Sequence, residues 1–290
     1  KNVVLGTALV DMYAKCGVLD KARDVFEQLP VRDVASWNAL IAGYAQNGHG
    51  EEALRCFREM QNEGVCADVI TYVCSLKACG ILGLSKVGQD IDAEVREKGL
   101  LEKNIVLSTA LVDMYFKCGA LEKAQAVFQM LPEHDPVSWN VLLSGYVQQR
   151  HGEEALKCFR QMKDLGISPT AVTYACILKA CGIVGCLEIG KDIDIEVRKQ
   201  GLLQKDTALY DSLLAMYSKC GAPKKAREVF EELPAGDLMS WNSLIDGYVQ
   251  LGQANVVLDM YIKMKADGVE PNLITFTLLL CACSHAGLLQ

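Results

Sequence analysis

One phrase is written three times in this chain, and it limits the fold more than any other feature. ASWNALIAGYAQN, VSWNVLLSGYVQQ and MSWNSLIDGYVQL contain the only tryptophans, Trp37, Trp139 and Trp241, which stand 102 residues apart. A period of this length exceeds one supersecondary unit, so each period must contain several smaller ones. The sequence therefore predicts a repeat protein.

Each period divides into three helical hairpins. Apolar residues recur at three- and four-residue steps, as in Leu40, Ile41 and Tyr44, which is typical of one helix face. Glycines such as Gly17 and Gly48 follow the expected helix ends. We call the hairpins short, standard and long, for lengths of 31, 35 and 36 residues. The short hairpins are 3–33, 105–135 and 207–237, the standard ones 34–68, 136–170 and 238–272, and the long ones 69–104, 171–206 and the incomplete 273–290.

Such hairpins cannot bury a core alone, but a stack of them buries a continuous one. The predicted fold is all-α, a right-handed α-solenoid superhelix of stacked helix-turn-helix repeats in one array over 1–290. The last hairpin stops at Gln290 before its second helix is complete, so we expect a segment of a longer protein. We identify no signal or transit peptide and no apolar run of the roughly 18 residues that predict a membrane span.

The composition favours some functions over others. The net charge of −7 counts against a nucleic-acid partner, although local fields matter more than the sum. Ten of the thirteen cysteines recur at fixed places of the period, as Cys16, Cys118 and Cys220 do, and the chain has no CxxC. This placement predicts reduced thiols buried between helices, not disulfides or a metal site, and hence a reducing compartment.

The asparagine that follows each tryptophan is the first candidate functional residue. Asn38 lies about 100° around the helix from Trp37, off the apolar face. Ser36 is a good N-cap for this helix, which leaves the asparagine without an obvious local task. One interpretation is that it satisfies a free backbone group of the first turn. The other is that it recognises a ligand.

Polar residues that vary within the repeated scaffold favour a ligand. The standard hairpins end in Asp68, Thr170 and Asn272, and Thr7 and Thr109 of the first two short hairpins are replaced by Asp211 in the third. One polar side chain per hairpin would form a ladder of donors and acceptors along the first helices. Single-stranded RNA suits such a ladder, because its unstacked bases expose their hydrogen-bonding edges.

Two further sets of residues fit this interpretation. One apolar residue near the start of each hairpin could stack on bases, the alternative being core packing: Val4, Ala35, Ile70, Val106, Val137, Val172, Ala208, Met239 and Ile274. Lysines expected near the ends of first helices could bind phosphates, the alternative being a cation that caps the helix C-terminus: Lys15, Lys77, Lys117, Lys179 and Lys219.

The chain resembles a pentatricopeptide repeat protein of the subclass with alternating short, standard and long repeats, the P-L-S class of land plants. LVDMYAKCG with ARDVFEQLPVRD resembles the short repeat, VSWNVLLSGYVQ with EALKCFRQMKDLGISPT the standard repeat, and AVTYACILKACG the long repeat. The ordered lengths extend over the whole chain. Tetratricopeptide repeats have a similar period, but their Trp-Leu-Gly-Tyr pattern is not present.

The resemblance implies a base code. In that family the fifth and last residues of a repeat jointly choose the base, and the RNA runs 5′ to 3′ along the N-to-C direction. The implied base-reading residues are Thr7, Asp33, Asn38, Asp68, Val73, Asn104, Thr109, Asp135, Asn140, Thr170, Ala175, Asp206, Asp211, Asp237, Asn242, Asn272 and Thr277.

The implied target is roughly G-U-n-G-y-n-?-C. Thr7 with Asp33 and Thr109 with Asp135 imply G, Asn38 with Asp68 implies U, Asn242 with Asn272 implies C, and Asn140 with Thr170 implies a pyrimidine. Asp211 with Asp237 departs from the usual pairs. Val73 and Ala175 cannot hydrogen-bond a base, so their long hairpins should select little.

No catalytic site is predicted within these residues. Cys283 and His285 have no third group to orient them, and no cofactor is expected. The resemblance implies the target-recognition module of an organellar C-to-U RNA editing factor, with any cytidine deaminase domain beyond Gln290. It also implies a mitochondrial or chloroplast location, a monomer, and small editing cofactor proteins bound at the long hairpins. The alternatives are a factor for RNA processing or stability without editing, and a protein-interaction solenoid.

Overall fold

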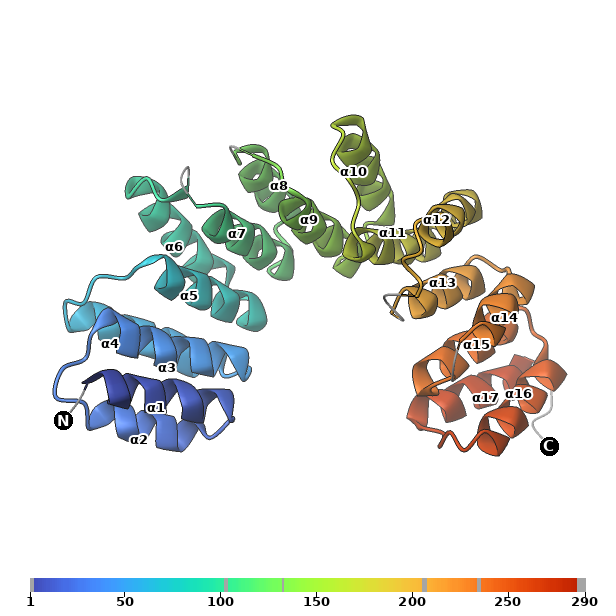
Figure 1. Cartoon of the computed structure of the whole chain (residues 1–290), viewed down its shortest axis with the longest axis horizontal. Helices are drawn as coiled ribbons and strands as arrows, with labels where there is room; N and C mark the ends of the chain where they lie inside the picture. The colour runs from blue at the N-terminus through green and yellow to red at the C-terminus, as the bar shows by residue number, and fades with distance from the viewer. Residues whose placement is uncertain (1–2, 102–103, 132, 205–207, 234–235, 286–290) are drawn as a thin grey trace. The chain divides into compact units, whose positions relative to one another are not determined.

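The computed structural model describes residues 3–101, 104–131, 133–204, 208–233 and 236–285. These residues form seventeen α-helices and no strand, so the predicted all-α class is confirmed (Figure 1). Among the described residues, none of the helices has the length and apolar character that a membrane crossing requires.

The helices alternate between first and second members of hairpins. The first helices are α1 (Val3–Lys15), α3 (Val34–Gln46), α5 (Val69–Leu82), α7 (Ile105–Lys117), α9 (Pro136–Gln148), α11 (Ala171–Val184), α13 (Ala208–Lys219), α15 (Leu238–Gln250) and α17 (Leu273–His285). The second helices are α2 (Leu19–Glu27), α4 (Gly50–Asn62), α6 (Ser85–Glu97), α8 (Leu121–Gln129), α10 (Gly152–Asp164), α12 (Leu187–Lys199), α14 (Pro223–Glu231) and α16 (Ala254–Ala266).

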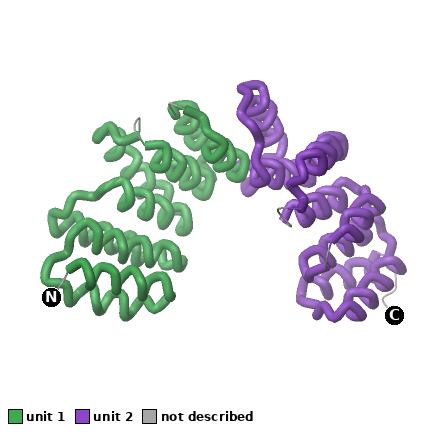
Figure 2. Tube along the Cα trace, in the orientation of Figure 1, with its two compact units in different colours: residues 1–145 green, residues 146–290 purple. Residues whose placement is uncertain are grey.

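The chain forms two compact units, Lys1–Gly145 and Tyr146–Gln290 (Figure 2). In unit 1, α1, α3, α5 and α7 pack against one another in chain order, and α2, α4 and α6 each contact the first helices before and after them. Unit 2 repeats this arrangement, with α11, α13, α15 and α17 as its row of first helices. Each unit is therefore a two-layered α-solenoid.

The repeated tryptophans lie in the core between successive hairpins. Each packs edge-on against a phenylalanine of the preceding second helix, with ring centroids 4.5 Å apart for Phe26 and Trp37, 4.9 Å for Phe128 and Trp139, and 4.6 Å for Phe230 and Trp241. No described group accepts a hydrogen bond from the three buried indole N–H groups. The tryptophans therefore stabilise the stack by apolar contact.

The helix ends agree with the glycine pattern. Gly17 and Gly48 adopt φ of 74° and 82°, a left-handed conformation that glycine adopts without steric cost. All thirteen cysteines are free thiols, and burial raises the pKa of Cys79 and Cys181 to about 12. The prediction of buried thiols is wrong at three positions, because Cys16, Cys66 and Cys281 are exposed.

Candidate nucleic-acid interface

The fifth and last residues of two standard hairpins lie in contact although they are 30 residues apart. The Asn38 Nδ2 donates to Oδ1 and Oδ2 of Asp68 at 2.9 and 3.1 Å. The Asn242 Nδ2 donates to Oδ1 of Asn272 at 3.3 Å. In these two hairpins, the positions singled out from the sequence come together.

The last residue of a hairpin is also the N-cap of the next first helix. Asp68 accepts a hydrogen bond from the Thr71 backbone N–H at 2.9 Å, and Asn272 accepts one from the Thr275 N–H at 3.0 Å. Aspartate, asparagine and threonine all satisfy this role, which explains why the residue at this position is always polar. Its variation between hairpins is thus confined to residues that can cap a helix.

The prediction that Ser36 caps its helix is wrong. Asp33 is the N-cap of α3, and its carboxylate accepts from the Ser36 N–H at 2.9 Å. The Ser36 hydroxyl donates back to the Asp33 carbonyl at 2.8 Å. Both residues favour N-caps, and the earlier start adds most of a helical turn with its backbone hydrogen bonds.

A threonine that the sequence analysis did not single out completes the contact. The Thr71 hydroxyl donates to Asn38 Oδ1 at 2.6 Å, and the Thr275 hydroxyl donates to Asn242 Oδ1 at 2.7 Å. Within the described residues, the Asn38 amide is therefore bound by side chains at the start of the next hairpin. The alternative prediction, a contact with a free backbone group of its own first turn, is wrong.

Asn38 and Asn242 are more buried than we expect for an open ladder of hydrogen-bonding groups. Only 7% of Asn38 and 8% of Asn242 is exposed, whereas Asn140 is half-buried. Asn242 and Asn272 line a hollow of about 670 Å³ between α15 and α17, together with Met239 and Ile274. Volumes of this order are typical of small-molecule sites.

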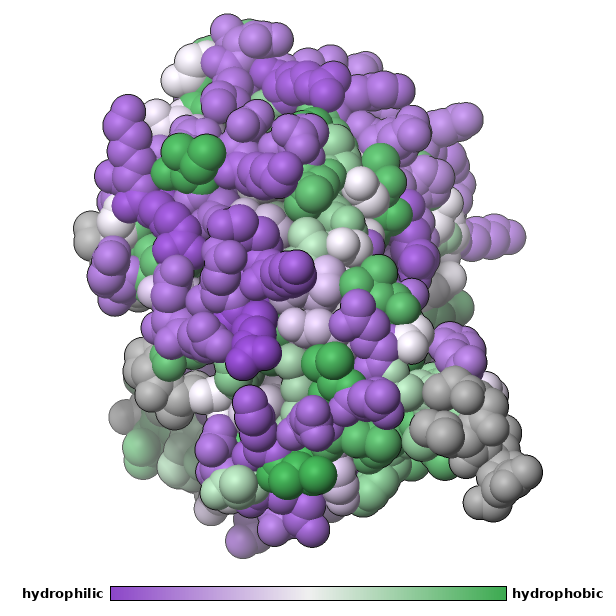
Figure 3. Space-filling view, turned by 90° about the vertical axis from the view of Figure 1, so that its right-hand side faces the viewer, coloured by the Kyte–Doolittle hydropathy of each residue, from purple (hydrophilic) through white to green (hydrophobic). Residues whose placement is uncertain are grey.

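The apolar residues predicted to stack on bases all lie at the surface. The nine are exposed, including Met239 at 65% and Ile274 at 58%, on either side of the Asn242–Asn272 pair. Core packing, the alternative, is therefore wrong for them. Figure 3 shows apolar side chains at the surface of the face in view, in small groups between hydrophilic ones.

Hydrogen bonds keep Asp68 ionised. Burial acts to raise its pKa, but the Thr71 N–H and the Asn38 amide outweigh this and hold the pKa below its usual value. Asp211 differs, because burial and the nearby charge of Asp237 raise its pKa. The pKa of Asp237 is lowered by bonds from the Ser240 backbone and hydroxyl, so it stays charged as the cap of α15.

The short hairpins do not show the same contact. The Thr109 hydroxyl donates to the Val106 carbonyl at 2.9 Å, and the buried Thr7 hydroxyl has no partner among the described residues. In the described structure, neither hydroxyl bonds to the last residue of its hairpin, Asp33 or Asp135. These pairs are therefore not joined as the standard ones are.

The remaining predicted base-reading residues fall into three groups. Val73, Asn104, Thr170, Ala175 and Asp211 are half-buried, and the exposed Thr277 donates to the Leu273 carbonyl at 2.8 Å. Asn104 and Thr170 are N-caps of α7 and α11. Asp206 lies outside the described residues.

The five lysines are all exposed, but they differ in their partners. Lys15 and Lys117 end their helices and form ion pairs with Asp11 at 2.7 Å and Asp113 at 2.6 Å. Lys77 and Lys179 lie in the middle of α5 and α11, so the prediction that they stand near helix ends is wrong.

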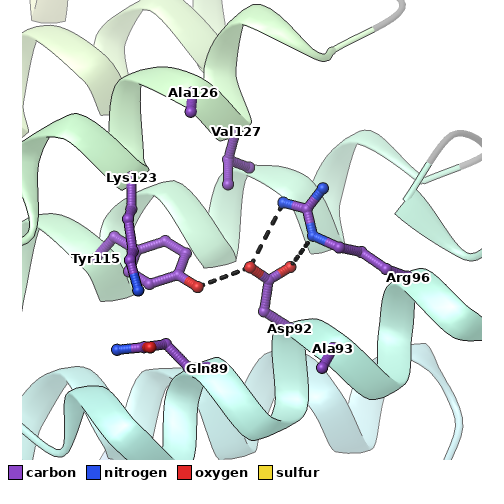
Figure 4. A pocket seen from close by; sticks show the side chains of 8 residues that line it. All are labelled: Gln89, Asp92, Ala93, Arg96, Tyr115, Lys123, Ala126 and Val127. Carbon is purple, nitrogen blue, oxygen red and sulfur yellow. Dashed lines mark hydrogen bonds and ion pairs between the residues drawn. The ribbon is translucent and has the colours of Figure 1, made fainter.

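A buried carboxylate on a second helix joins a long hairpin to the next short hairpin. Asp92 accepts hydrogen bonds from Arg96 Nε and the Tyr115 hydroxyl, both at 2.6 Å, beside a hollow of about 320 Å³ (Figure 4). Asp194 repeats this contact. Only 9% of each aspartate is exposed, although both lie on second helices rich in charged residues.

Comparison with known protein families identifies the repeats. The model of the PPR repeat family matches residues 32–80, 134–182 and 236–285. A second model, PPR repeat, matches 7–34, 106–135 and 208–236. The chain belongs to the pentatricopeptide repeat family. This confirms the family predicted from the sequence.

Curated relatives from Arabidopsis thaliana match over nearly the full chain. Pentatricopeptide repeat-containing protein At2g33680 is 38% identical over 99% of this chain and 39% of its own length. The putative mitochondrial protein At3g25060 is 37% identical over 100% and 48%, and the chloroplastic protein At4g18520 is 36% identical over 99% and 46%. The chain spans half or less of these relatives. The names of the second and third relatives assign them to the mitochondrion and the chloroplast, and this confirms the predicted location in a plant organelle.

Solved pentatricopeptide repeat structures share the fold. The crystal structure of PPR10 in complex with an 18-nt psaJ RNA element matches with a TM-score of 0.81 and 20% identity, over 98% of this chain and 43% of that one. The crystal structure of PPR10 from maize matches with a TM-score of 0.57 and 19% identity, over 99% and 52%.

Proposed function

We propose that this pentatricopeptide repeat chain binds single-stranded RNA with sequence specificity, one base per hairpin. We further propose that it is the target-recognition module of an organellar C-to-U editing factor of the P-L-S subclass. The succession of short, standard and long hairpins supports the subclass. The likeness to a protein crystallised with RNA supports the class of ligand.

The hollow around Asn242 and Asn272 carries the proposal. An exposed apolar residue stands on each side of it, Met239 from α15 and Ile274 from α17. A base between them would have apolar contacts on its faces and an amide at its edge. The Asn242 amide still has one N–H and one lone pair beyond its bonds to Asn272 and Thr275. Such a site favours a flat, hydrogen-bonding ligand.

The proposed register follows the hairpins. Short hairpins with Thr7 or Thr109 select G, the standard hairpin with Asn38 and Asp68 selects U, and the one with Asn242 and Asn272 selects C. The exposed apolar residues stack on the bases, and the exposed lysines bind phosphates. Long hairpins contribute length and, in this proposal, surfaces for small editing cofactor proteins. Deamination belongs to a domain outside these residues or to another protein.

The first test is binding of the chain to an RNA with G, U, G and C at the proposed spacing, against a scrambled RNA of equal composition. We expect tighter binding of the designed RNA by tenfold or more, since each matched base contributes hydrogen bonds and stacking. Equal affinity for both RNAs, or binding of neither, would remove the proposal in favour of a protein-interaction solenoid.

A reciprocal pair of variants tests the code itself. Asp68→Asn gives the first standard hairpin the side-chain pair of the third, and Asn272→Asp does the reverse. We expect Asp68→Asn to change the preferred base at its nucleotide from U to C, and Asn272→Asp from C to U. Both substitutions retain a residue that caps α5 or α17, so folding should be unaffected.

Each variant serves as the control for the other. Binding is measured with RNAs that differ only at the second or the eighth nucleotide of the target. Asp68→Asn should leave the preference at the eighth nucleotide unchanged, and Asn272→Asp that at the second. Variants that keep the wild-type preferences would show that these pairs do not choose the base.

A further inference from the structure

A third residue takes part in the contact between the fifth and last residues, and it belongs to the next hairpin. Thr71 is the third residue of α5 and Thr275 the third residue of α17. Both side chains are fully buried, and each hydroxyl donates to the asparagine oxygen of the preceding hairpin, at 2.6 and 2.7 Å. Each asparagine is therefore held by the first turn of the following helix.

The hydrogen bonds leave the amide only one orientation. The Thr275 backbone N–H can only donate, so the group of Asn272 that faces it is the oxygen Oδ1. That oxygen in turn accepts from Asn242, which fixes Nδ2 of Asn242 on this side and Oδ1 toward the Thr275 hydroxyl. In the other standard hairpin, the acceptor-only carboxylate of Asp68 fixes the Asn38 amide in the same way.

The sequence keeps a hydrogen-bonding third residue where the preceding fifth residue is polar. Counted from the start of each hairpin, the third residue is serine after a short hairpin, threonine after a standard hairpin and leucine after a long hairpin. These residues are Ser36, Ser138 and Ser240; Thr71, Thr173 and Thr275; Leu107 and Leu209. The leucines follow Val73 and Ala175, which have no side-chain donor or acceptor to orient.

Serine and threonine are not equivalent here. The Ser36 and Ser138 hydroxyls donate to the carbonyls of their own caps, Asp33 and Asp135, both at 2.8 Å. The Thr71 and Thr275 hydroxyls also contact their own caps, at 3.0 and 3.1 Å from Oδ1 of Asp68 and Asn272, but each lies closer to the asparagine oxygen of the preceding hairpin. The orientation of an amide by the next hairpin is thus found in the first and third standard hairpins.

We propose that the third residue of the next first helix is a specificity-determining residue, which orients the base-reading asparagine without touching the base. This inference rests on the proposed function. An asparagine amide presents a donor or an acceptor according to its rotation, and a freely rotating amide would accept either pyrimidine. Thr71 holds the oxygen of Asn38 while Asp68 holds its nitrogen, and Thr275 and Asn272 do the same for Asn242. Base choice in these standard hairpins then depends on three residues from two hairpins.

Thr71→Val removes the hydroxyl at nearly constant volume, and Thr71→Ser is the matched control that keeps it. We expect Thr71→Val to lower the preference for U over C at the second nucleotide by about three- to tenfold, the scale of one hydrogen bond. The preference at the eighth nucleotide should not change. Thr275→Val should show the opposite pattern, and Thr71→Ser should stay within about twofold of wild type.

Ser36→Ala separates orientation from capping. It removes a first-turn hydroxyl that bonds only to its own cap. We expect it to lower thermal stability about as much as Thr71→Val does, without changing the preference at any nucleotide. Equal losses of base preference in Ser36→Ala and Thr71→Val would assign the effect to stability and overturn the inference.

A measurement without RNA distinguishes this inference from the proposed function. Hydrogen exchange of the Asn38 side-chain amide, followed by NMR after asparagine-selective labelling, should be about three- to tenfold faster in Thr71→Val than in wild type. Unchanged exchange would overturn the inference even if the chain binds RNA. Faster exchange in a chain without any base preference would retain the orientation by Thr71 but remove the proposed function.

Discussion

At the scale of the residue, one side chain meets two demands at the end of each standard hairpin. Asp68 caps α5 through the Thr71 N–H and also binds the Asn38 amide. Because this residue caps a helix, only a few polar residue types are suitable at the position. Those types offer different hydrogen-bonding groups to Asn38. A position can therefore vary in sequence without any loss of helix stability.

The sequence identified Asn38 but not its surroundings. A polar residue beside a repeated tryptophan is visible as a pattern. Its burial and its bond to Thr71 depend on how residues 33 positions apart meet in space. That contact follows from the start of α5, which sequence patterns locate to within a few residues only. The error at Ser36, three residues inside its helix, has the same origin.

Asp211 should make stability depend on pH. Its pKa is raised by burial and by the charge of Asp237, so the folded state holds its proton more tightly than the unfolded state does. The ionised form therefore destabilises the fold above the raised pKa, and this cost disappears as the pH falls below it.

Asp211→Asn should therefore raise the melting temperature at pH 7 and have little effect near pH 3. The gain should be a fraction of 1 kcal/mol, since the side chain is only half-buried. Differential scanning calorimetry of both proteins at each pH isolates this residue from the other carboxylates. A gain that is equal at both pH values would contradict the assignment.

At the scale of the element, the hairpins were predictable because glycine and apolar spacing act locally. Gly17 and Gly48 end helices through a backbone conformation that the residue itself permits. The contacts between helices were less visible. The burial of Asp92, which joins α6 to Tyr115 of α7, is not evident from the sequence, because its charged neighbours are typical of a solvated surface.

The close contact between α1 and α3 allows a test of how the first helices pack. A Cβ atom added at Gly43 of α3 would lie 2.4 Å from the Cβ of Ala14 on α1, and both positions are buried. We expect Gly43→Ala to lower the free energy of unfolding by about 1–3 kcal/mol through overpacking. Chemical denaturation measures this loss.

The double variant Ala14→Gly with Gly43→Ala is the control. It moves the methyl group from α1 to α3 and should recover part of the loss, because the helices meet without a clash. A loss equal to the sum of the two single variants would show that this contact does not limit the approach of the helices.

At the scale of the whole molecule, the fold class followed from the period, because hairpins this short are stable only as a stack. The partner is a separate question, and the net charge of −7 requires an explanation if the ligand is RNA. Two of the five lysines are moreover held in ion pairs. Lys15 and Lys117 are neutralised by Asp11 and Asp113, so fewer cations are available to phosphates than the sequence suggests.

RNA binding should therefore depend only weakly on salt. Within the described residues, Lys77, Lys179 and Lys219 form no ion pair. At about −0.7 per phosphate on a single strand, these three lysines give an expected slope of log K against log salt of about −2. Lys77→Gln should reduce the slope by about 0.7.

Asp11→Asn provides the opposite change. It releases Lys15 from its ion pair, and we expect the slope to become steeper by about 0.7. Titrations at four or more salt concentrations with the designed RNA measure both variants. If neither substitution moves the slope, these lysines do not contact phosphates.

The bond from a threonine to an asparagine of the preceding hairpin also has a consequence for the insertion and removal of hairpins. If the proposed function holds, a base-selecting site belongs to a junction and not to a hairpin, so an array has one complete site fewer than it has first helices. Excision of the long hairpin 69–104 alone would set Asn38 against Leu107, a pairing found at no junction of this chain. Excision of 102 consecutive residues preserves every junction type. The 102-residue period of the sequence is therefore the shortest length whose removal or addition leaves every junction type unchanged.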